Sequence, residues 1–252
     1  GNQRHLLLVQ NVTDLQKADA MRRDFVANVS HEMRTPITVL MGFLETVQSL
    51  DLEKSQRDQY FEMMMAQALR MKSLVEDLLT LANLESNSLP AVAKPVHINT
   101  LMALLRNDAE ALSMGRHSFS FENLSEQDLL GDEREVLSAF SNLVSNAIRY
   151  TPDVGTVDVK WSVNAEGYGE FSVTDTGPGI AAEHLSRLTE RFYRVDRSRS
   201  RDTGGTGLGL AIVKHIASRH QAQLIIESTP GRGSTFKLRF PKERLTPVVQ
   251  TT

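Results

Sequence analysis

Apolar residues recur every seven positions in the first third of the chain. Two such series, offset by three residues, run through the same stretch: Val26, Met33, Leu40 and Val47, and Val29, Pro36, Phe43 and Leu50. This spacing is typical of the seam of a coiled coil. It predicts a long helix from about residue 15 to residue 48.

A second helix is predicted over residues 57–86, after a polar turn at residues 49–55. Its apolar stripe is too wide to be covered by one neighbouring helix. The stripe consists of Met64, Met71, Leu74, Val75, Leu78, Leu79, Leu81 and Ala82. Two such helices bury their apolar faces best when the hairpin pairs with a second copy, so we expect a dimeric four-helix bundle with the methionines in its core.

The pattern changes after residues 89–95, a stretch with two prolines that we interpret as a linker. From there on, short strands and helices follow one another. The predicted elements are a strand and helix from residue 96, a strand at 118–123, a helix at 132–150, a hairpin at 156–161 and 167–175, a helix at 210–219, and strands at 223–228 and 234–240. Residues 5–14, before the first long helix, favour a further strand.

Composition limits the possible functions. The 252 residues carry a net charge of −3, which gives no electrostatic reason to propose nucleic acid as a partner. The chain has no cysteine, which excludes disulfides, thiolate metal sites and cysteine nucleophiles. No apolar run reaches the roughly 18 residues that span a bilayer, and no signal-peptide pattern is present. We therefore expect this stretch of chain to be soluble.

His31 is a candidate for chemical modification. With Val26 counted as position a of the heptad, His31 falls at position f and points away from the apolar seam. Glu32 can accept a proton or orient the imidazole, Thr35 lies one turn further on the same face, and Pro36 removes a backbone donor. An exposed imidazole beside a carboxylate is a competent nucleophile at neutral pH. The alternative is a surface histidine without a chemical role.

The residues around His31 resemble a known family. Ser-His-Glu-Met-Arg-Thr-Pro-Ile-Thr (30–38) resembles the phosphoacceptor box of HisKA-type sensor histidine kinases, and residues 25–30 look most like the phosphate-regulon sensor kinase subgroup. Met33 and Ile37 stand where leucine is more usual, which the same packing accommodates. The resemblance implies that the second domain binds ATP and that a sensory part lies upstream.

Two further stretches resemble the nucleotide-binding boxes of that family. Asn142, Asn146 and Arg149 share one face of the predicted 132–150 helix, and residues 142–152, with Tyr150, resemble the N box of the GHKL ATP-binding fold. In that family the second asparagine, here Asn146, ligates Mg²⁺. Asp175, Gly177 and Gly179 resemble the G1 box, in which the aspartate accepts a hydrogen bond from adenine. By themselves, three polar residues on a helix face and an Asp-x-Gly-x-Gly turn are common features of ordinary proteins.

The last two boxes flank an arginine-rich loop. Residues 190–194, with Arg191 and Arg194, resemble the F box, and further arginines follow at positions 197, 199 and 201. The glycine-rich stretch after the loop leads into a helix and consists of Gly205, Thr206, Gly207, Leu208 and Gly209. It predicts a nucleotide lid whose arginines reach phosphates, although such a run also fits an exposed loop. A Rossmann fingerprint would need glycine at position 210, and no P-loop sequence is present.

The resemblance implies a fold and domain boundaries. We expect α plus α/β architecture, with a dimeric four-helix bundle followed by a GHKL (Bergerat) α/β sandwich with a mixed sheet. The boundaries are a signalling linker at 1–22, a dimerisation and phosphotransfer domain at 23–88, a linker at 89–95, a catalytic domain at 96–245 and a tail at 246–252.

The resemblance also implies a function. ATP and Mg²⁺ would be the cofactors, His31 the phosphoacceptor, Glu32 the base or orienting group, and Thr35 a phosphatase residue. The partners would be a second copy of the chain and the receiver domain of a response regulator. The fragment would be cytoplasmic, and the full-length protein would be anchored in the inner membrane. The alternatives are a GHKL ATPase that acts as a conformational clamp, which would carry glutamate where Asn142 stands, and a scaffold that binds nucleotide without chemistry.

Overall fold

The computed structural model describes residues 13–86, 89–195 and 205–247. The chain divides into two compact units, residues 1–72 and 73–252, and helix α2 (Lys54–Ser86) runs through the division. Most of the strand predicted at residues 5–14 lies outside the described residues, and its last two residues begin helix α1 (Thr13–Ser49). No helix in the described ranges has the length and apolar character needed to cross a membrane.

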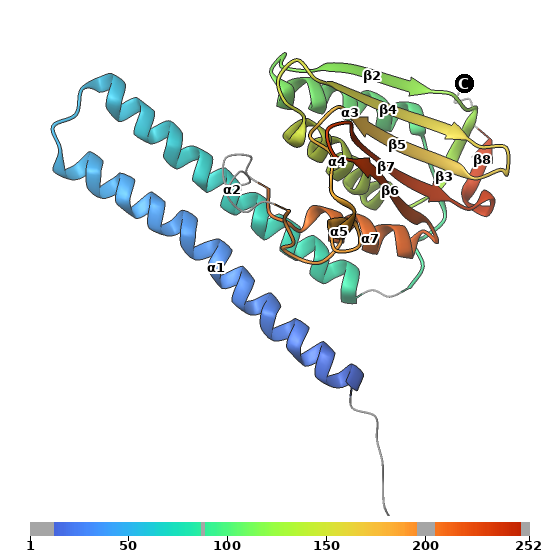
Figure 1. Ribbon diagram of the computed structural model, residues 1–252, viewed down its shortest axis with the longest axis horizontal. Helices are drawn as coiled ribbons and strands as arrows, with labels where there is room; N and C mark the ends of the chain where they lie inside the picture. The colour runs from blue at the N-terminus through green and yellow to red at the C-terminus, as the bar shows by residue number, and fades with distance from the viewer. Residues whose placement is uncertain (1–12, 87–88, 196–204, 248–252) are drawn as a thin grey trace, which may run out of the picture. The chain divides into compact units, whose positions relative to one another are not determined.

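The first unit is a hairpin of α1 and the beginning of α2, coloured blue to cyan in Figure 1. The two helices are antiparallel: the ring centroids of Phe43 and Tyr60 lie 5.6 Å apart, and the carboxylate of Glu32 lies 3.5 Å from the guanidinium of Arg70. Where α2 begins, the backbone N–H of Glu53 donates to the side-chain oxygen of Gln56 at 3.2 Å, half of a capping box. The predicted helical hairpin is confirmed.

Large apolar side chains of this hairpin are exposed on both helices. They are Val26, Ile37, Met41, Leu44, Leu50, Phe61, Met63, Met65 and Leu69. An exposed apolar surface of this kind is rare on a monomer and common where a partner binds. The four-helix bundle formed by two chains is consistent with this surface and stays a prediction.

The second unit is built around a five-stranded sheet with the order β2-β4-β5-β7-β6. Its strands are β2 (Ser118–Asn123), β4 (Thr156–Val163), β5 (Gly169–Asp175), β7 (Gly233–Phe240) and β6 (Gln223–Thr229). β2 and β4 are parallel, whereas the other neighbouring pairs are antiparallel. The predicted mixed sheet is therefore confirmed.

Three helices pack on one face of this sheet: α3 (Ile98–Ser113), α4 (Glu133–Tyr150) and α7 (Gly209–Arg219) (Figure 1). Alternate strand residues face these helices and are buried, among them Val159 and Val173, while their neighbours are polar. The ring of Phe140 on α4 stacks on that of Phe171 on β5 with centroids 3.6 Å apart. The core thus lies between one sheet face and the helices, as in an α/β sandwich. A short helix, α5 (Ala182–Leu185), follows β5.

The second unit also has a second sheet of three short antiparallel strands, of which the sequence predicted only one, from residue 96, where β1 (Lys94–Val96) ends. The sheet consists of β1, β3 (Gln127–Gly131) and β8 (Leu245–Pro247), and a 3-10 turn, η1 (Lys242–Arg244), precedes β8. The guanidinium of buried Arg244 donates to the carbonyl of Ala91 at 3.2 Å.

These contacts correct two expectations at the edges of the second domain. Thr246 and Pro247, assigned to a loose tail, belong to β8 because they pair with Asp128 and Gln127 of β3. The end of the expected linker, from Lys94, belongs to β1 for the same reason: it pairs with β3. The other predicted domain boundaries stay predictions.

His220 joins two helices in the interior of the second unit. Its imidazole is fully buried, donates through Nδ1 to the carbonyl of Ile216 at 2.9 Å and accepts through Nε2 from the backbone N–H of Asp132 at 3.1 Å. Asp132 in turn caps α4, since its side chain accepts from the N–H groups of Arg134 and Glu135. Burial is the main reason why the pKa of His220 is lowered, because it penalises the charged form.

We expect the stability of the second unit to depend on His220 below neutral pH. The unfolded chain takes up a proton near the ordinary histidine pKa of 6.5, whereas the folded chain does so only at lower pH. The stability is therefore complete above pH 6.5 and is lost as pH falls from there toward the lower folded-state pKa. Urea unfolding followed by the fluorescence of Trp161, the one tryptophan of the chain, measures this effect at several pH values.

The matched variants are His220→Gln and, as a control at an exposed histidine, His31→Gln. His220→Gln should lower the free energy of unfolding by about 1–3 kcal/mol, because the rigid imidazole that bridges the Ile216 carbonyl and the Asp132 N–H is lost, and should also flatten the slope with pH between 6.5 and the lower pKa. The control should keep the slope. A slope that persists in His220→Gln would contradict the assignment.

Candidate functional site

His31 lies exposed on α1, and its neighbours on that helix are held by local contacts. The hydroxyl of Thr35 donates to the carbonyl of His31 at 3.3 Å. Pro36 is buried in the middle of the helix and has no N–H to donate to the carbonyl four residues earlier. The carboxylate of Glu32 accepts from Arg70 of α2 at 3.5 Å. The imidazole is thus accessible, and the carboxylate beside it has a fixed partner.

Helix α4 presents Asn142, Asn146 and Arg149 from one half-buried face, while Tyr150 at its end is exposed. The amide of Asn142 donates to the carbonyl of Ser138 at 2.9 Å. The side chain of Asn146 makes no hydrogen bond to any residue within 13–86, 89–195 or 205–247. Its oxygen is therefore available to a ligand.

Asp175 ends β5 and is buried. Its carboxylate accepts a 2.8 Å hydrogen bond from the backbone N–H of Gly177. Burial raises the pKa of Asp175, while this hydrogen bond and a second one from the backbone of Ser234 oppose the shift. A buried carboxylate of this kind is a strong acceptor for a donor that a ligand brings.

The glycines after Asp175 are needed by the packing of the protein itself. A Cβ on Gly177 would lie 2.9 Å from the carbonyl oxygen of Tyr150, and a Cβ on Gly179 would lie 2.1 Å from that of Thr229. Gly179 also has φ +69°, a left-handed conformation that favours glycine. These contacts give a structural reason for both glycines, alongside the expected approach of a ligand.

The stretches on either side of the predicted lid are joined by a backbone hydrogen bond. The backbone N–H of Phe192 donates to the carbonyl of Gly207 at 2.8 Å. Both residues have positive φ, 62° and 74°, and a Cβ on Gly207 would lie 2.9 Å from the Cα of Phe192. We call these paired stretches, residues 191–194 and 205–208, the lid stem. The expected lid arginines at 197, 199 and 201 lie outside the described residues.

Two guanidinium groups flank the glycine-rich stretch. A Cβ on Gly205 would lie 3.3 Å from Nη1 of Arg149 and 3.8 Å from Nη2 of Arg194, and a Cβ on Gly209 would lie 2.5 Å from Oδ1 of Asn142. Leu208 is buried, and no side chain caps the N-terminus of α7 that follows it. The structure therefore brings residues of α4, the F box and the glycine-rich stretch together, in an arrangement suited to bind an anion.

Two contacts of the lid stem were missed from the sequence. Thr206 donates to the carboxylate of Asp77 at 2.6 Å, and Arg191 pairs with Glu85; both carboxylates lie on the part of α2 that belongs to the second unit. Asp77 shares a helix face with Leu74 and Leu81. A carboxylate within an apolar stripe was the feature of the sequence that could have indicated this contact.

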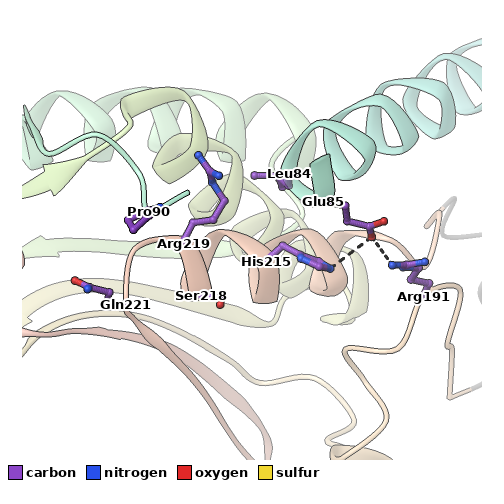
Figure 2. A pocket seen from close by; sticks show the side chains of 8 residues that line it. All are labelled: Leu84, Glu85, Pro90, Arg191, His215, Ser218, Arg219 and Gln221. Atoms are coloured by element: carbon purple, nitrogen blue, oxygen red, sulfur yellow. Dashed lines mark hydrogen bonds and ion pairs between the residues drawn. The ribbon is translucent and has the colours of Figure 1, made fainter. Parts of the chain in front are cut away.

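A cavity of about 410 Å³ lies beside Glu85, and Figure 2 shows the side chains that line it. Its lining consists of Leu84, Glu85, Pro90, Arg191, His215, Ser218, Arg219 and Gln221. Of the predicted nucleotide-binding residues it contains only Arg191, so it is distinct from the surroundings of Asp175 and Asn146.

The chain matches two protein-family models. Residues 21–87 match the His Kinase A (phospho-acceptor) domain, and residues 131–244 match the histidine kinase-, DNA gyrase B- and HSP90-like ATPase. The two matches contain His31 and the residues of the predicted nucleotide site.

Similar full-length proteins are sensor kinases. The phosphate regulon sensor protein PhoR of Pseudomonas aeruginosa is 52% identical over 95% of this chain and 54% of its own length. PhoR of Haemophilus influenzae is 37% identical over 94% of this chain and 56% of its own length, and the sensor-like histidine kinase SenX3 of Mycobacterium tuberculosis is 36% identical over 94% and 58%. The chain thus spans little more than half the length of these relatives.

Two solved structures have a similar fold. Full-length ShkA in complex with AMPPNP is 26% identical, with a TM-score of 0.63 over 89% of this chain and 46% of that chain. The histidine kinase AdeS of Acinetobacter baumannii is 24% identical, with a TM-score of 0.67 over 85% of this chain and 98% of that chain.

We expect the contact at Gly179 to govern the stability of the second unit. Gly179→Ala introduces both left-handed strain and a clash with the carbonyl of Thr229, whereas Gly231→Ala, at φ +78° in open space, introduces the strain alone. The control should lower the free energy of unfolding by about 1–2 kcal/mol. Gly179→Ala should lower it by about 1–3 kcal/mol more, because of the overpacking. Urea unfolding followed by Trp161 fluorescence measures both, and equal losses would contradict the clash.

Proposed function

The chain belongs to the HisKA-type sensor histidine kinases, and we propose that it uses ATP to phosphorylate His31 and passes the phosphoryl group to an aspartate of a response regulator. The observation that carries the proposal is the exposed imidazole of His31 on α1, in a chain whose second unit gathers Asn146, Asp175 and the lid stem. The glycine-rich stretch, with residues 205–209 beside two guanidinium groups, suits the phosphates of a nucleotide.

In the proposed complex, Asp175 accepts a hydrogen bond from the adenine amino group, and Arg149, Arg194 and the N–H groups around Gly205 face the phosphates. Burial of Asp175 supports this role, because a carboxylate that has left water gains more from each donor it meets. Gly207, Leu208 and Gly209 form the turn into α7. Tyr150 ends α4, and its carbonyl oxygen lies against Gly177 in the loop after β5.

Mg²⁺ fits this site as a partner of the phosphates. The described residues contain no group of three or more His, Cys, Asp or Glu side chains able to hold a metal alone. Mg²⁺ commonly takes few protein ligands together with phosphates and waters, and the amide oxygen of Asn146 is available for that purpose. When bound, Mg²⁺ would neutralise charge on the phosphates.

In the proposed transfer, a ring nitrogen of His31 attacks the γ-phosphorus of ATP. A nitrogen–phosphorus bond forms, the bond from the γ-phosphorus to the bridging oxygen breaks, and ADP leaves with the electron pair. The imidazole gives up a proton. Glu32 is suited to orient the ring or to accept that proton, and its carboxylate also lies 3.5 Å from the guanidinium of Arg70.

The clamp alternative is not favoured. A clamp ATPase of the same fold would need a carboxylate to activate water where Asn142 stands, and an amide cannot act as that base. The amide of Asn142 is instead bonded to the carbonyl of Ser138 within its own helix.

The partners that we propose are a second copy of this chain and a receiver domain. The apolar side chains exposed on both helices, such as Met41 and Leu69, suit the core of a bundle formed by two hairpins. His31 lies off that seam, so its imidazole would stay accessible to a receiver domain after pairing.

His31→Gln should abolish labelling of the chain from γ-labelled ATP. Its fold and nucleotide affinity should be unchanged, because the side chain is exposed on α1. Asp175→Asn is the matched variant: it should keep His31 but weaken ATP binding about 10- to 150-fold, the effect of losing a hydrogen bond to a charged group. The affinities for ATP are measured by calorimetry, and phosphorylation of the histidine is measured as acid-labile label on the chain. Label retained by His31→Gln would reject the assignment of the phosphoacceptor.

We also propose that Thr35 takes part in removing phosphate from the regulator, by positioning a water for in-line attack. Thr35→Ala should leave phosphorylation of His31 largely intact and slow the loss of phosphate from the phosphorylated regulator. The competing role is structural, since the hydroxyl donates to the carbonyl of His31.

Thr38→Ala is the matched control for that structural role, because the hydroxyl of Thr38 donates to the carbonyl of Arg34 in the same way, at 3.0 Å. Both rates are measured for both variants, with helicity followed by circular dichroism. If Thr35→Ala slows both activities alike, or neither, then Thr35 has only the structural role.

A further inference from the structure

The last turns of α2 pack onto the second unit. Leu74, Leu81 and Leu84 are buried there, and all of them belong to residues 73–252. Asp77 lies between them in sequence and on the same helix face, since positions 74, 77, 81 and 84 alternate steps of three and four residues. An apolar face of α2 therefore carries one carboxylate against the lid stem.

The carboxylate of Asp77 has partners that would also suit a phosphate. It accepts from the hydroxyl of Thr206 at 2.6 Å, and that hydroxyl in turn accepts from the backbone N–H of Leu208 at 3.2 Å. The positive charge of Arg149 stabilises the carboxylate. Carboxylates and phosphates are recognised by the same arginine and hydroxyl donors. Asp77 thus occupies the hydroxyl of Thr206, a residue of the proposed nucleotide site.

Glu85, two turns further along α2, engages the other side of the lid stem. Figure 2 shows its carboxylate between the guanidinium of Arg191 and the imidazole of His215, with dashed lines to both. The distance to Nε2 of His215 is 3.6 Å, and the carboxylate is about one-third exposed. Arg191 is the second predicted phosphate-binding residue that a carboxylate of α2 occupies.

The two contacts act on one structural element. Arg191 directly precedes Phe192, and Thr206 directly precedes Gly207, the two residues joined by the 2.8 Å backbone hydrogen bond of the lid stem. Asp77 and Glu85 lie on the same helix, and each contacts one of the two stretches that make up the lid stem.

We propose that Asp77 and Glu85 form a latch that competes with nucleotide phosphates for Thr206 and Arg191, so that ATP binds only when α2 releases the lid stem. This inference rests on the proposed function, because it takes the site to bind ATP. It assigns an inhibitory role to two carboxylates that do not touch the nucleotide.

The electrostatics of Asp77 support a latch that can open. Burial raises the pKa of Asp77, and the hydrogen bond from Thr206 and the charge of Arg149 offset only part of that shift. The charged carboxylate therefore recovers solvation when it leaves the contact, which lowers the cost of release.

The test compares affinities for a non-hydrolysable ATP analogue with Mg²⁺ on the whole 252-residue chain, by calorimetry. The variants are Asp77→Ala, Asp77→Asn, Glu85→Gln and the double variant, and the control is Glu62→Gln, which makes the same charge change at an exposed position of α2 in the first unit. Asp77→Ala and Glu85→Gln should each lower the Kd by about three- to tenfold, the range for removing one competing hydrogen bond. The double variant should lower it further, and the control should not change it.

A second measurement follows the latch without nucleotide. Hydrogen exchange of the Phe192 amide should be faster in the latch variants than in the control, because that amide belongs to the stem. Asp77→Asn separates charge from packing: it keeps the volume of the side chain and should give part of the effect of alanine.

The results distinguish the possible failures. Unchanged Kd and unchanged exchange would overturn the latch, as would variants that bind the analogue more weakly, since the contacts would then assist binding. If neither the unmodified chain nor any latch variant binds the analogue, the proposed function fails together with the competition, whereas an analogue bound equally by every variant overturns the latch alone.

Discussion

The site of the second unit depends on a close backbone contact between the loop after β5 and the turn that joins β6 to β7. Gly179 lies against the carbonyl of Thr229, and Gly233 lies so close to Asp175 that a Cβ there would be 1.9 Å from its carbonyl oxygen. The N–H of Gly231 donates to the carbonyl of Pro178 at 2.7 Å. No side chain fits between these segments, and the buried carboxylate of Asp175 is fixed as a consequence.

The same unit uses carboxylates in three different states. Asp132 caps α4, Asp175 is buried with two backbone donors, and Asp77 faces a hydroxyl and an arginine. Asp132 and Asp175 both accept from backbone N–H groups, but Asp132 is half-buried at a helix end, whereas Asp175 is buried at the end of a strand, where a further donor is bound more strongly than in water. This difference is why Asp175 suits recognition of a base and Asp132 suits only helix capping.

The sequence predicted the helices and strands whose apolar residues repeat regularly over many positions or that contain a specific motif. The heptads gave both long helices to within a few residues of α1 and α2, and the alternation at 118–123 and 234–240 matches β2 and β7 closely. They placed the first short strand at residue 96, where β1 ends, and missed β3 and β8, because three to five residues with a proline or a glycine are too few to show alternation.

The side-chain contacts of the site could be predicted only in part. The motifs brought Arg149 and Gly205 together, and the structure places Nη1 of that arginine 3.3 Å from a Cβ on the glycine. They could not predict that Arg191 pairs with Glu85, 106 residues earlier in the chain, or that Thr206 donates to Asp77. Such contacts depend on tertiary packing, and periodicity within one element contains no information about it.

Helix α2 belongs to both units and makes one polar contact in each. Arg70, which lies 3.5 Å from the carboxylate of Glu32, and Asp77, which accepts from Thr206, are seven residues apart and therefore lie on the same side of one continuous helix. The contact with Glu32 lies in the first unit and the contact with Thr206 in the second, so α2 takes part in the packing of both.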